Sequence, residues 1–156
     1  MKIIILGANQ VGSTLAETLA MENNDITIVD NDAARLRELK DHMDIGTIQG
    51  QASHPDVLER AGCEDADMII AVTESDEINM VACRVAYSLF HTPKKICRLR
   101  STSYLVSDKL FGKQGVAVDV VISPELIVSS YIKSLINLPG SLQVLDFADG
   151  KVQLVA

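Results

Sequence analysis

The sequence has little of what disulfide frameworks, zinc sites and basic surfaces require. Its three cysteines, Cys63, Cys83 and Cys97, are odd in number, widely spaced and set in apolar segments, a pattern typical of reduced core thiols. Acidic residues outnumber basic ones by 21 to 14, which gives a net charge of −7. Because nucleic acid and anionic lipid bind basic surfaces, we expect no nucleic-acid partner and only local recognition of phosphate.

Long apolar runs are also missing from the sequence. Runs such as Ile3–Leu6 and Met68–Val72 are far shorter than the ~18 apolar residues of a membrane-spanning helix. Met1 leads directly into the first run, without the basic segment, apolar stretch and cleavage site of a secretory signal. We therefore expect a cytoplasmic chain with no direct membrane insertion.

The residue patterns of common catalytic and metal sites are absent. The sequence has no Ser-His-Asp arrangement, HExxH helix or Walker A lysine. His42, His54 and His91 are not spaced as metal ligands. The cysteines do not have the spacing of a zinc site either. We predict no catalytic residues and no metal site, so the chain is predicted not to be an enzyme.

What the sequence does contain is an alternation of short β-branched runs with longer stretches of helical period. At 156 residues and 47% hydrophobic content, it suits one main domain with a two-sided core. The pattern predicts an α/β fold of the Rossmann-like, doubly wound kind, with a parallel sheet in the order 3-2-1-4-5-6. The expected strands are Lys2–Leu6, Ile26–Asp30, Ile45–Gln49, Met68–Val72, Lys95–Leu99 and Val118–Ile122.

The end of the chain has a different pattern. Leu138-Pro139-Gly140 should end the last helix, and Asp149-Gly150 is a strong hairpin turn between two apolar runs. We predict a nucleotide-binding domain over residues 1–138 and a C-terminal β-hairpin over residues 139–156. Because an apolar strand would then stop at an unpaired edge, we expect the hairpin to begin a further domain of a longer protein.

The most informative segment is the first strand, the glycine-bearing turn after it, and the acid that ends the second strand. Gly7 permits a tight turn, and Gly12 lets the next helix pack closely on the sheet. The helix N-terminus offers free amides to a pyrophosphate. Asp30 follows Gly12 at close to the ~20-residue spacing of a carboxylate that binds an adenosine ribose. An acid there also favours NAD over NADP.

Asn9 departs from this fingerprint, because the usual middle glycine is missing. Asparagine tolerates left-handed backbone better than most residues, but its side chain occupies space that a pyrophosphate would approach. The alternative is an ordinary strand-to-helix turn that binds no ligand.

Two further segments should lie on the same edge of the sheet. The fourth strand is followed by Thr73 and Glu74, whose hydroxyl and backbone amides are candidates for contact with ribose or base. The run from Thr73 to Asp76 also resembles a helix capping box, which is a purely structural alternative. Arg98 ends the fifth strand and is a candidate for pairing with phosphate, although exposed arginines are common at strand ends.

Taken together, several segments resemble those of the RCK/KTN family: Ile4–Gly12, Asp30, Gly50–Leu58, Asp65–Asn79, Ile96–Arg100 and Ile122–Glu125. The resemblance covers essentially the whole chain. It implies a cytosolic regulatory subunit, peripheral on the cytoplasmic face of the inner membrane, that controls a potassium-translocating membrane partner. It also implies homo-oligomers formed by pairing of Rossmann domains, and cofactors that are NAD or NADH, with ATP or ADP as alternatives.

Carried onto matching positions, the resemblance implies a set of site residues. The turn and helix start would hold the pyrophosphate, Asp30 the ribose, Thr73 and Glu74 the cleft wall, and Arg98 a phosphate or a neighbouring subunit. The turn and helix start comprise Gly7, Ala8, Asn9, Gln10, Val11 and Gly12. Besides Asn9, Gln51 departs from the family pattern, because an acid often follows the third-strand glycine there.

Three functions remain open at this point. A ligand-sensing module that regulates potassium transport fits a nucleotide cleft without catalytic residues. The cofactor-binding portion of an NAD-dependent dehydrogenase would need catalytic residues in a further domain. A scaffold that binds no nucleotide would follow if Asn9 closes the site.

Overall fold

Six short strands form one parallel sheet in the computed structural model, which describes residues 1–106, 110–111, 114–137, 144–147 and 152–155. The strands are β1 (Lys2–Leu6), β2 (Asp25–Asp30), β3 (Gly46–Gln49), β4 (Met68–Ala71), β5 (Lys94–Arg98) and β6 (Val120–Ile122). Every pairing between neighbours is parallel, and the order is β3-β2-β1-β4-β5-β6. The predicted fold class and strand order are confirmed.

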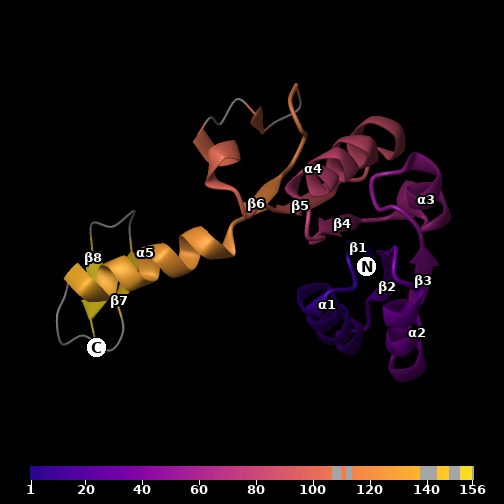
Figure 1. Cartoon of the computed structure of the whole chain (residues 1–156), viewed down its shortest axis with the longest axis horizontal. Helices are drawn as coiled ribbons and strands as arrows, with labels where there is room; N and C mark the ends of the chain where they lie inside the picture. The colour runs from indigo at the N-terminus through magenta and orange to yellow at the C-terminus, as the bar shows by residue number, and fades with distance from the viewer. Residues whose placement is uncertain (107–109, 112–113, 138–143, 148–151, 156) are drawn as a thin grey trace. The chain divides into compact units, whose positions relative to one another are not determined.

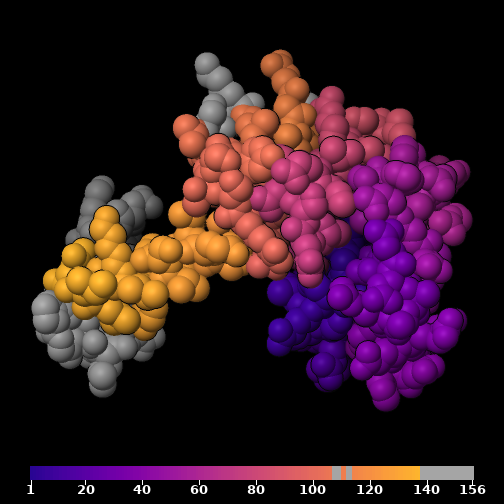
Figure 2. Space-filling model, in the orientation of Figure 1, coloured from indigo at the N-terminus to yellow at the C-terminus, as the bar shows by residue number. Residues whose placement is uncertain are grey.

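Helices cover both faces of this sheet (Figure 1). They are α1 (Gln10–Met21), α2 (Ala33–His42), α3 (Pro55–Arg60) and α4 (Asp76–Val85), and α4 continues into a π-helical turn, η2 (Ala86–Phe90). In Figure 1, α1 and α2 lie on one side of the strands and α3 and α4 on the other. The space-filling view shows these segments, from indigo to pink, packed against one another over the face that it presents (Figure 2).

The central strand β1 divides the core into two layers. Ile3 and Ile5 pack in one cluster with residues of α1 and α2, whereas Ile4 and Leu6 pack in another with residues of α3 and α4. All four side chains are at most 3% exposed. Full burial of such a side chain contributes about 1.5 to 3 kcal/mol to folding. A strand that is apolar at four consecutive positions, Ile3 to Leu6, therefore becomes the middle of a sheet covered on both faces.

Strand ends differ slightly from the sequence expectation. The expected strand Val118–Ile122 begins only at Val120. Ala117 has a left-handed backbone, with φ of 60°, and the chain bends again at Asp119, so the extended conformation begins only after these two turns. The fifth strand begins and ends one residue earlier than expected, as Lys94–Arg98.

The chain divides into two units, Met1–Ile122 and Ser123–Ala156. Within the second, α5 (Pro124–Asn137) precedes β7 (Val144–Phe147) and β8 (Val152–Val155), which pair antiparallel. This pairing confirms the predicted hairpin. Its predicted turn at Asp149-Gly150, the helix end at Leu138-Pro139-Gly140 and the domain boundary at 138 lie outside the described residues. Within the part of the chain that the structure describes, no helix is long and apolar enough to cross a membrane.

Candidate functional site

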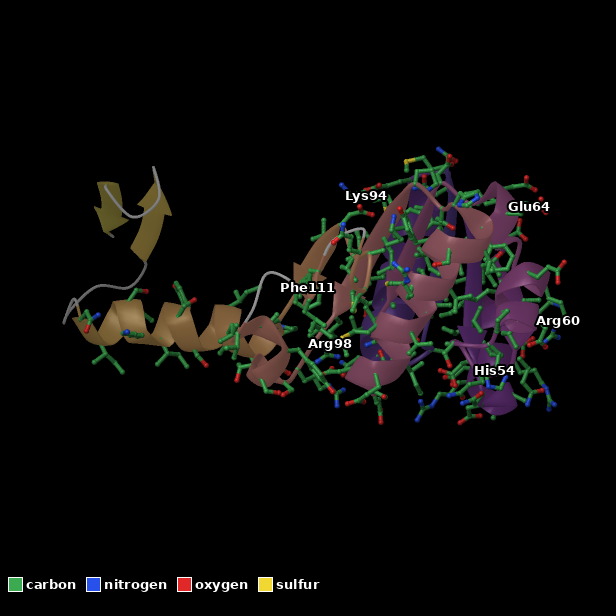
Figure 3. All side chains as sticks on the ribbon, turned by 90° about the horizontal axis from the view of Figure 1, so that it is seen from above. His54, Arg60, Glu64, Lys94, Arg98 and Phe111 are labelled. Atoms are coloured by element: carbon green, nitrogen blue, oxygen red, sulfur yellow. The ribbon has the colours of Figure 1, made fainter. Side chains whose placement is uncertain are left out.

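The candidate site is a cavity of ≈ 330 Å³ at the carboxyl ends of four neighbouring strands. It lies where the winding of the sheet reverses between β1 and β4, the position at which open α/β sheets bind ligands. In Figure 3, Lys94 and Arg98 mark the start and end of β5, and His54 lies at the same edge as Arg98. The residues that line the cavity include Gly7, Asn9, Asp30, Asn31, Arg35, Gln51, Thr73, Glu74 and Ser75.

A larger cavity of ≈ 490 Å³ lies elsewhere, lined by residues of η2 and by Lys95 and Asp119 near the amino ends of β5 and β6. Its only buried charge is already paired, since Lys95 Nζ lies 2.8 Å from Asp119 Oδ2 and also donates to the carbonyl oxygens of Thr92 and Pro93. The smaller cavity carries the glycine turn and the acid after β2, so chemistry rather than size identifies it as the candidate site.

Close packing explains both glycines of the turn. Gly7 has φ of 107°, and a Cβ atom there would lie 3.0 Å from the backbone nitrogen of Thr73. A Cβ atom on Gly12 would lie 1.8 Å from the carbonyl oxygen of Gly7, a distance that no side chain tolerates. The two glycines therefore bring β1, α1 and the segment after β4 together around the cavity.

Asn9 sits in this turn in a way that the sequence did not reveal. Its backbone is extended, with φ of −73° and ψ of 178°, so the expected reason for tolerating asparagine, a left-handed backbone, is wrong. The side chain instead caps α1, because Oδ1 accepts hydrogen bonds from the backbone nitrogens of Val11 and Gly12, both at 3.1 Å. Nδ2 donates to the carbonyl oxygen of Val72 at 2.7 Å.

Asp30 connects the end of β2 to the same turn. Its Oδ2 accepts a hydrogen bond from the backbone nitrogen of Ala8 at 2.6 Å, and Oδ1 accepts one from the backbone nitrogen of Asp32 at 2.8 Å. A carboxylate has about four acceptor positions, so this one retains the capacity to accept hydrogen bonds from a ligand in the cavity. Asp30 thus has both a structural role and a position suited to binding.

The wall after β4 is held by Asn79 of α4 rather than by capping at Thr73. Thr73 donates to Asn79 Oδ1 from its backbone nitrogen and its hydroxyl. The capping box expected to start at Thr73 is wrong. α4 begins at Asp76, and Ser75 is its N-cap, because its hydroxyl accepts from the backbone nitrogen of Ile78 at 3.2 Å.

Acidic groups of α4 tie this wall to the segment after β5. Asp76, which is 8% exposed, accepts hydrogen bonds from the backbone nitrogens of Arg100 and Ser101. Glu77 accepts one from the Tyr104 hydroxyl at 2.7 Å and one from Ser75 at 2.8 Å. The bond from Tyr104 is the main cause that holds the pKa of Glu77 below its usual 4.5, and the same bond raises the pKa of Tyr104.

The structure brings together only some of the predicted site residues. Gly7, Asn9, Asp30, Thr73 and Glu74 line one cavity. Ala8 and Gln10 line another, of ≈ 440 Å³, between α1 and α2. Gly12 is buried and Val11 is 41% exposed. Arg98 is not among the residues that line the candidate cavity, although its carbonyl oxygen accepts from Asn79 Nδ2 at 3.0 Å.

Sequence reasoning missed three polar residues that line the cavity: Asn31, Arg35 and Ser75. Asn31 directly follows β2, and its Nδ2 donates to Oε1 of Gln51, which follows β3, at 2.7 Å. Gln51 was noted only as a departure from a family pattern. Their positions in the sequence could have identified these two residues, since residues just after parallel strands meet at one edge of the sheet. Arg35, in the first turn of α2, lies too far along the chain for that rule.

The arrangement is suited to binding a polar ligand. It places the carboxylates of Asp30 and Glu74, the guanidinium of Arg35 and neutral polar groups around one cavity. Among the described residues no cluster of His, Cys, Asp and Glu could hold a metal ion. Strand order and the glycine turn define a Rossmann-type α/β domain. The family model described as the TrkA-N domain matches residues 3–124. The chain belongs to the TrkA-N domain family, which confirms the resemblance seen in the sequence.

Curated relatives extend this match over the whole chain. It is 62% identical over 156 residues to the Trk system potassium uptake protein TrkA of Halomonas elongata, covering 100% of this chain and 34% of that protein. It is 59% identical over 157 residues to the protein of the same name from Vibrio alginolyticus, again with 100% and 34% covered. The chain thus spans about a third of the length of the curated relatives it matches.

Solved structures share the fold at low sequence identity. The TrkA-N domain of the inner membrane protein ybaL from Escherichia coli matches with a TM-score of 0.74 at 17% identity, covering 88% of this chain and 96% of that one. The AMP-bound Kef CTD of Shewanella denitrificans gives 0.68 at 19% identity, with 90% and 84% covered. The GsuK channel bound to NAD gives 0.65 at 21% identity, with 79% and 21% covered.

Proposed function

We propose that this chain is the nucleotide-sensing domain of a regulatory subunit that controls potassium uptake through a membrane transporter or channel. One observation carries the proposal: Asp30 and two residues of the glycine turn, Gly7 and Asn9, line a single cavity at the switch point of the sheet. The names of the relatives support the link to potassium uptake. The AMP bound to the Kef CTD and the NAD bound to the GsuK channel support an adenine nucleotide as the ligand.

The nucleotide is NAD or NADH, with ATP or ADP as the alternatives, and each part of it has a proposed partner. Asp30 accepts hydrogen bonds from the adenosine ribose, and Thr73 with Glu74 forms the wall beside it. The turn from Gly7 to Gly12 lies against the phosphates. Arg98, which does not line this cavity, binds a phosphate at the edge of the site or a neighbouring subunit.

Regulation requires no chemistry at the site. A nucleotide that binds two arrangements of an oligomer with different affinity shifts the balance between them, and the shift biases the membrane partner. The oligomer is a homo-oligomer that pairs Rossmann domains, located at the cytoplasmic face of the inner membrane. The apolar residues of α5 support such pairing, since Ile127, Ile132 and Ile136 are 61%, 50% and 70% exposed.

Titration calorimetry of the purified chain with NAD, NADH, ATP, ADP and NADP tests the nucleotide site. We expect saturable binding of NADH or ATP and much weaker binding of NADP, because the Asp30 carboxylate repels a 2′-phosphate. If none of the nucleotides binds, the remaining function is a scaffold that binds no nucleotide. Hydride transfer to a carbonyl substrate by the complete protein would support the dehydrogenase alternative instead.

Sedimentation velocity tests the assembly. We expect dimers or larger species of the chain at micromolar concentration, with a distribution that shifts when the nucleotide is added. Ile132→Glu should reduce association, whereas Glu125→Gln on the same helix serves as the control. A chain that stays monomeric at every protein concentration, with and without nucleotide, would contradict pairing through this region.

A further inference from the structure

The side chain of Asn9 spans the gap between the glycine turn and the end of β4. Its Oδ1 accepts from the backbone nitrogens of Val11 and Gly12 at 3.1 Å each, and its Nδ2 donates to the carbonyl oxygen of Val72 at 2.7 Å. The two bonds to Oδ1 fill its acceptor positions, and the bond from Nδ2 fixes the other end of the side-chain amide. Asn9 also lines the candidate cavity, so this fixed group lies where a ligand would enter.

The amides that Asn9 holds are groups that a phosphate would use. A helix N-terminus binds phosphate through first-turn backbone amides that have no partner within the helix. In the first turn of α1, Asn9 occupies the amides of Val11 and Gly12, and in the turn before the helix Asp30 occupies the amide of Ala8. The turn therefore satisfies internally three donors that a glycine-rich turn usually leaves to its ligand.

We propose that Asn9 is an internal competitor for the phosphate groups of the nucleotide and thereby sets which part of the ligand the cleft recognises. The inference rests on the proposed nucleotide site. A phosphate reaches the first-turn amides only after the Asn9 side chain leaves them and gives up its bond to Val72. The adenosine portion, which meets Asp30 and Thr73, binds without this exchange. The chain thus binds the adenosine portion with undiminished affinity and the phosphates with reduced affinity.

The size of the effect follows from what is exchanged. A bound phosphate takes over the two backbone amides, so the uncompensated loss is the single bond to the Val72 carbonyl oxygen, which corresponds to roughly a tenfold loss of affinity. Glycine at position 9 removes the competitor. It also remains an acceptable helix N-cap, so α1 should still form.

The experiment is a titration of the wild-type chain and of Asn9→Gly with adenosine and with ADP. We expect Asn9→Gly to bind ADP roughly tenfold more tightly and to bind adenosine with unchanged affinity. Asn9→Asp keeps the shape of the side chain but adds a negative charge at the amides, and we expect it to weaken ADP and spare adenosine. Thermal unfolding checks each variant, and Asn9→Asp, which keeps a capping side chain, still tests the inference if the glycine variant does not fold.

Asn31→Ala is the matched control. Asn31 lines the same cavity, but its Nδ2 donates to Gln51 and not to a carbonyl at the turn, so the two ligands should change together. ADP affinity that is unchanged or weaker in Asn9→Gly, with adenosine binding intact, would overturn the inference and leave the proposed nucleotide site standing. If no variant binds either ligand, the proposed site fails and the inference fails with it.

Discussion

The side-chain oxygen of Asn79 accepts two hydrogen bonds from Thr73, one from its backbone nitrogen at 2.9 Å and one from its hydroxyl at 2.6 Å. The amide nitrogen of Asn79 donates to the carbonyl oxygens of Thr73 and Arg98, at 3.3 and 3.0 Å. Asn79 is 0% exposed, so water does not reach these groups. Asn79, which does not itself line the cavity, therefore fixes the wall after β4 to the end of β5.

Replacing Asn79 by alanine should lower the free energy of unfolding by about 2 to 4 kcal/mol, because buried partners lose their hydrogen bonds together. Urea unfolding followed by circular dichroism measures the loss. Asn24→Ala is the matched control, since Asn24 makes a single bond from Nδ2 to the carbonyl oxygen of Leu19 and should cost about 1 kcal/mol. Equal losses for the two variants would mean that the Asn79 network adds nothing beyond one ordinary bond.

Asp30→Ala should weaken adenosine binding by about 1 to 3 kcal/mol if the carboxylate accepts charge-assisted bonds from the ribose. Calorimetric titration of the two chains with adenosine gives the difference directly. Asp25→Ala controls for loss of acidic charge, because Asp25 lies at the opposite end of β2 and does not line the cavity. Unchanged affinity in Asp30→Ala would remove Asp30 from the site.

The sequence predicted the parts of the fold that follow from a regular pattern of apolar residues or from a local motif. From Ile3 to Leu6, β1 is apolar at every position, a pattern typical of a central strand that is buried on both faces. Gly7, Gly12 and Asp30 could be assigned because their backbone conformation or spacing follows from one local unit of strand, turn and helix.

The rest depends on side-chain partners that no spacing rule encodes. Asn9 was identified as unusual, yet its bond to Val72 joins residues from two different strand ends, which one sequence does not display. Thr73 seemed to be a helix cap because its neighbours suit a capping box. Asn79 binds it instead, and Ser75 takes the cap. Arg35 reaches the cavity from α2, a placement that follows from helix packing and not from strand ends.

Acid should weaken the contact between α4 and the segment after β5. The hydrogen bond from Tyr104 holds the pKa of Glu77 below its usual 4.5, so the ionised form is preferred in the folded chain. A lowered carboxyl pKa stabilises the fold above the ordinary pKa, and this stabilisation is lost as pH falls through the lowered value. We therefore expect the wild type to lose part of its thermal stability between about pH 5 and pH 3, beyond what Glu77→Gln loses.

Thermal unfolding curves of both chains, recorded from about pH 6 to about pH 3, test this expectation. Tyr104→Phe removes the same bond from the donor side and should reduce the pH-dependent difference to a similar extent, while the double variant should add little. Parallel curves for wild type and Glu77→Gln across the acid range would mean that the bond contributes nothing to folding.

Gly12→Ala should destabilise the chain although alanine is the better helix former. The added Cβ would meet the carbonyl oxygen of Gly7 at 1.8 Å and the carbonyl carbon at 3.0 Å, and both are backbone atoms that cannot turn aside. Forced backbone shifts of this kind cost about 1 to 3 kcal/mol or more, which exceeds the ~1 kcal/mol gained in helix propensity. Because Gly7 lies against Thr73, the shift should also reach the cavity and weaken adenosine binding.

Thr14→Ala, at an exposed position of the same helix, should leave both properties unchanged or slightly improved. Urea unfolding and adenosine titration of the two variants separate the outcomes: a Gly12→Ala chain as stable as Thr14→Ala would show that α1 need not approach β1 so closely.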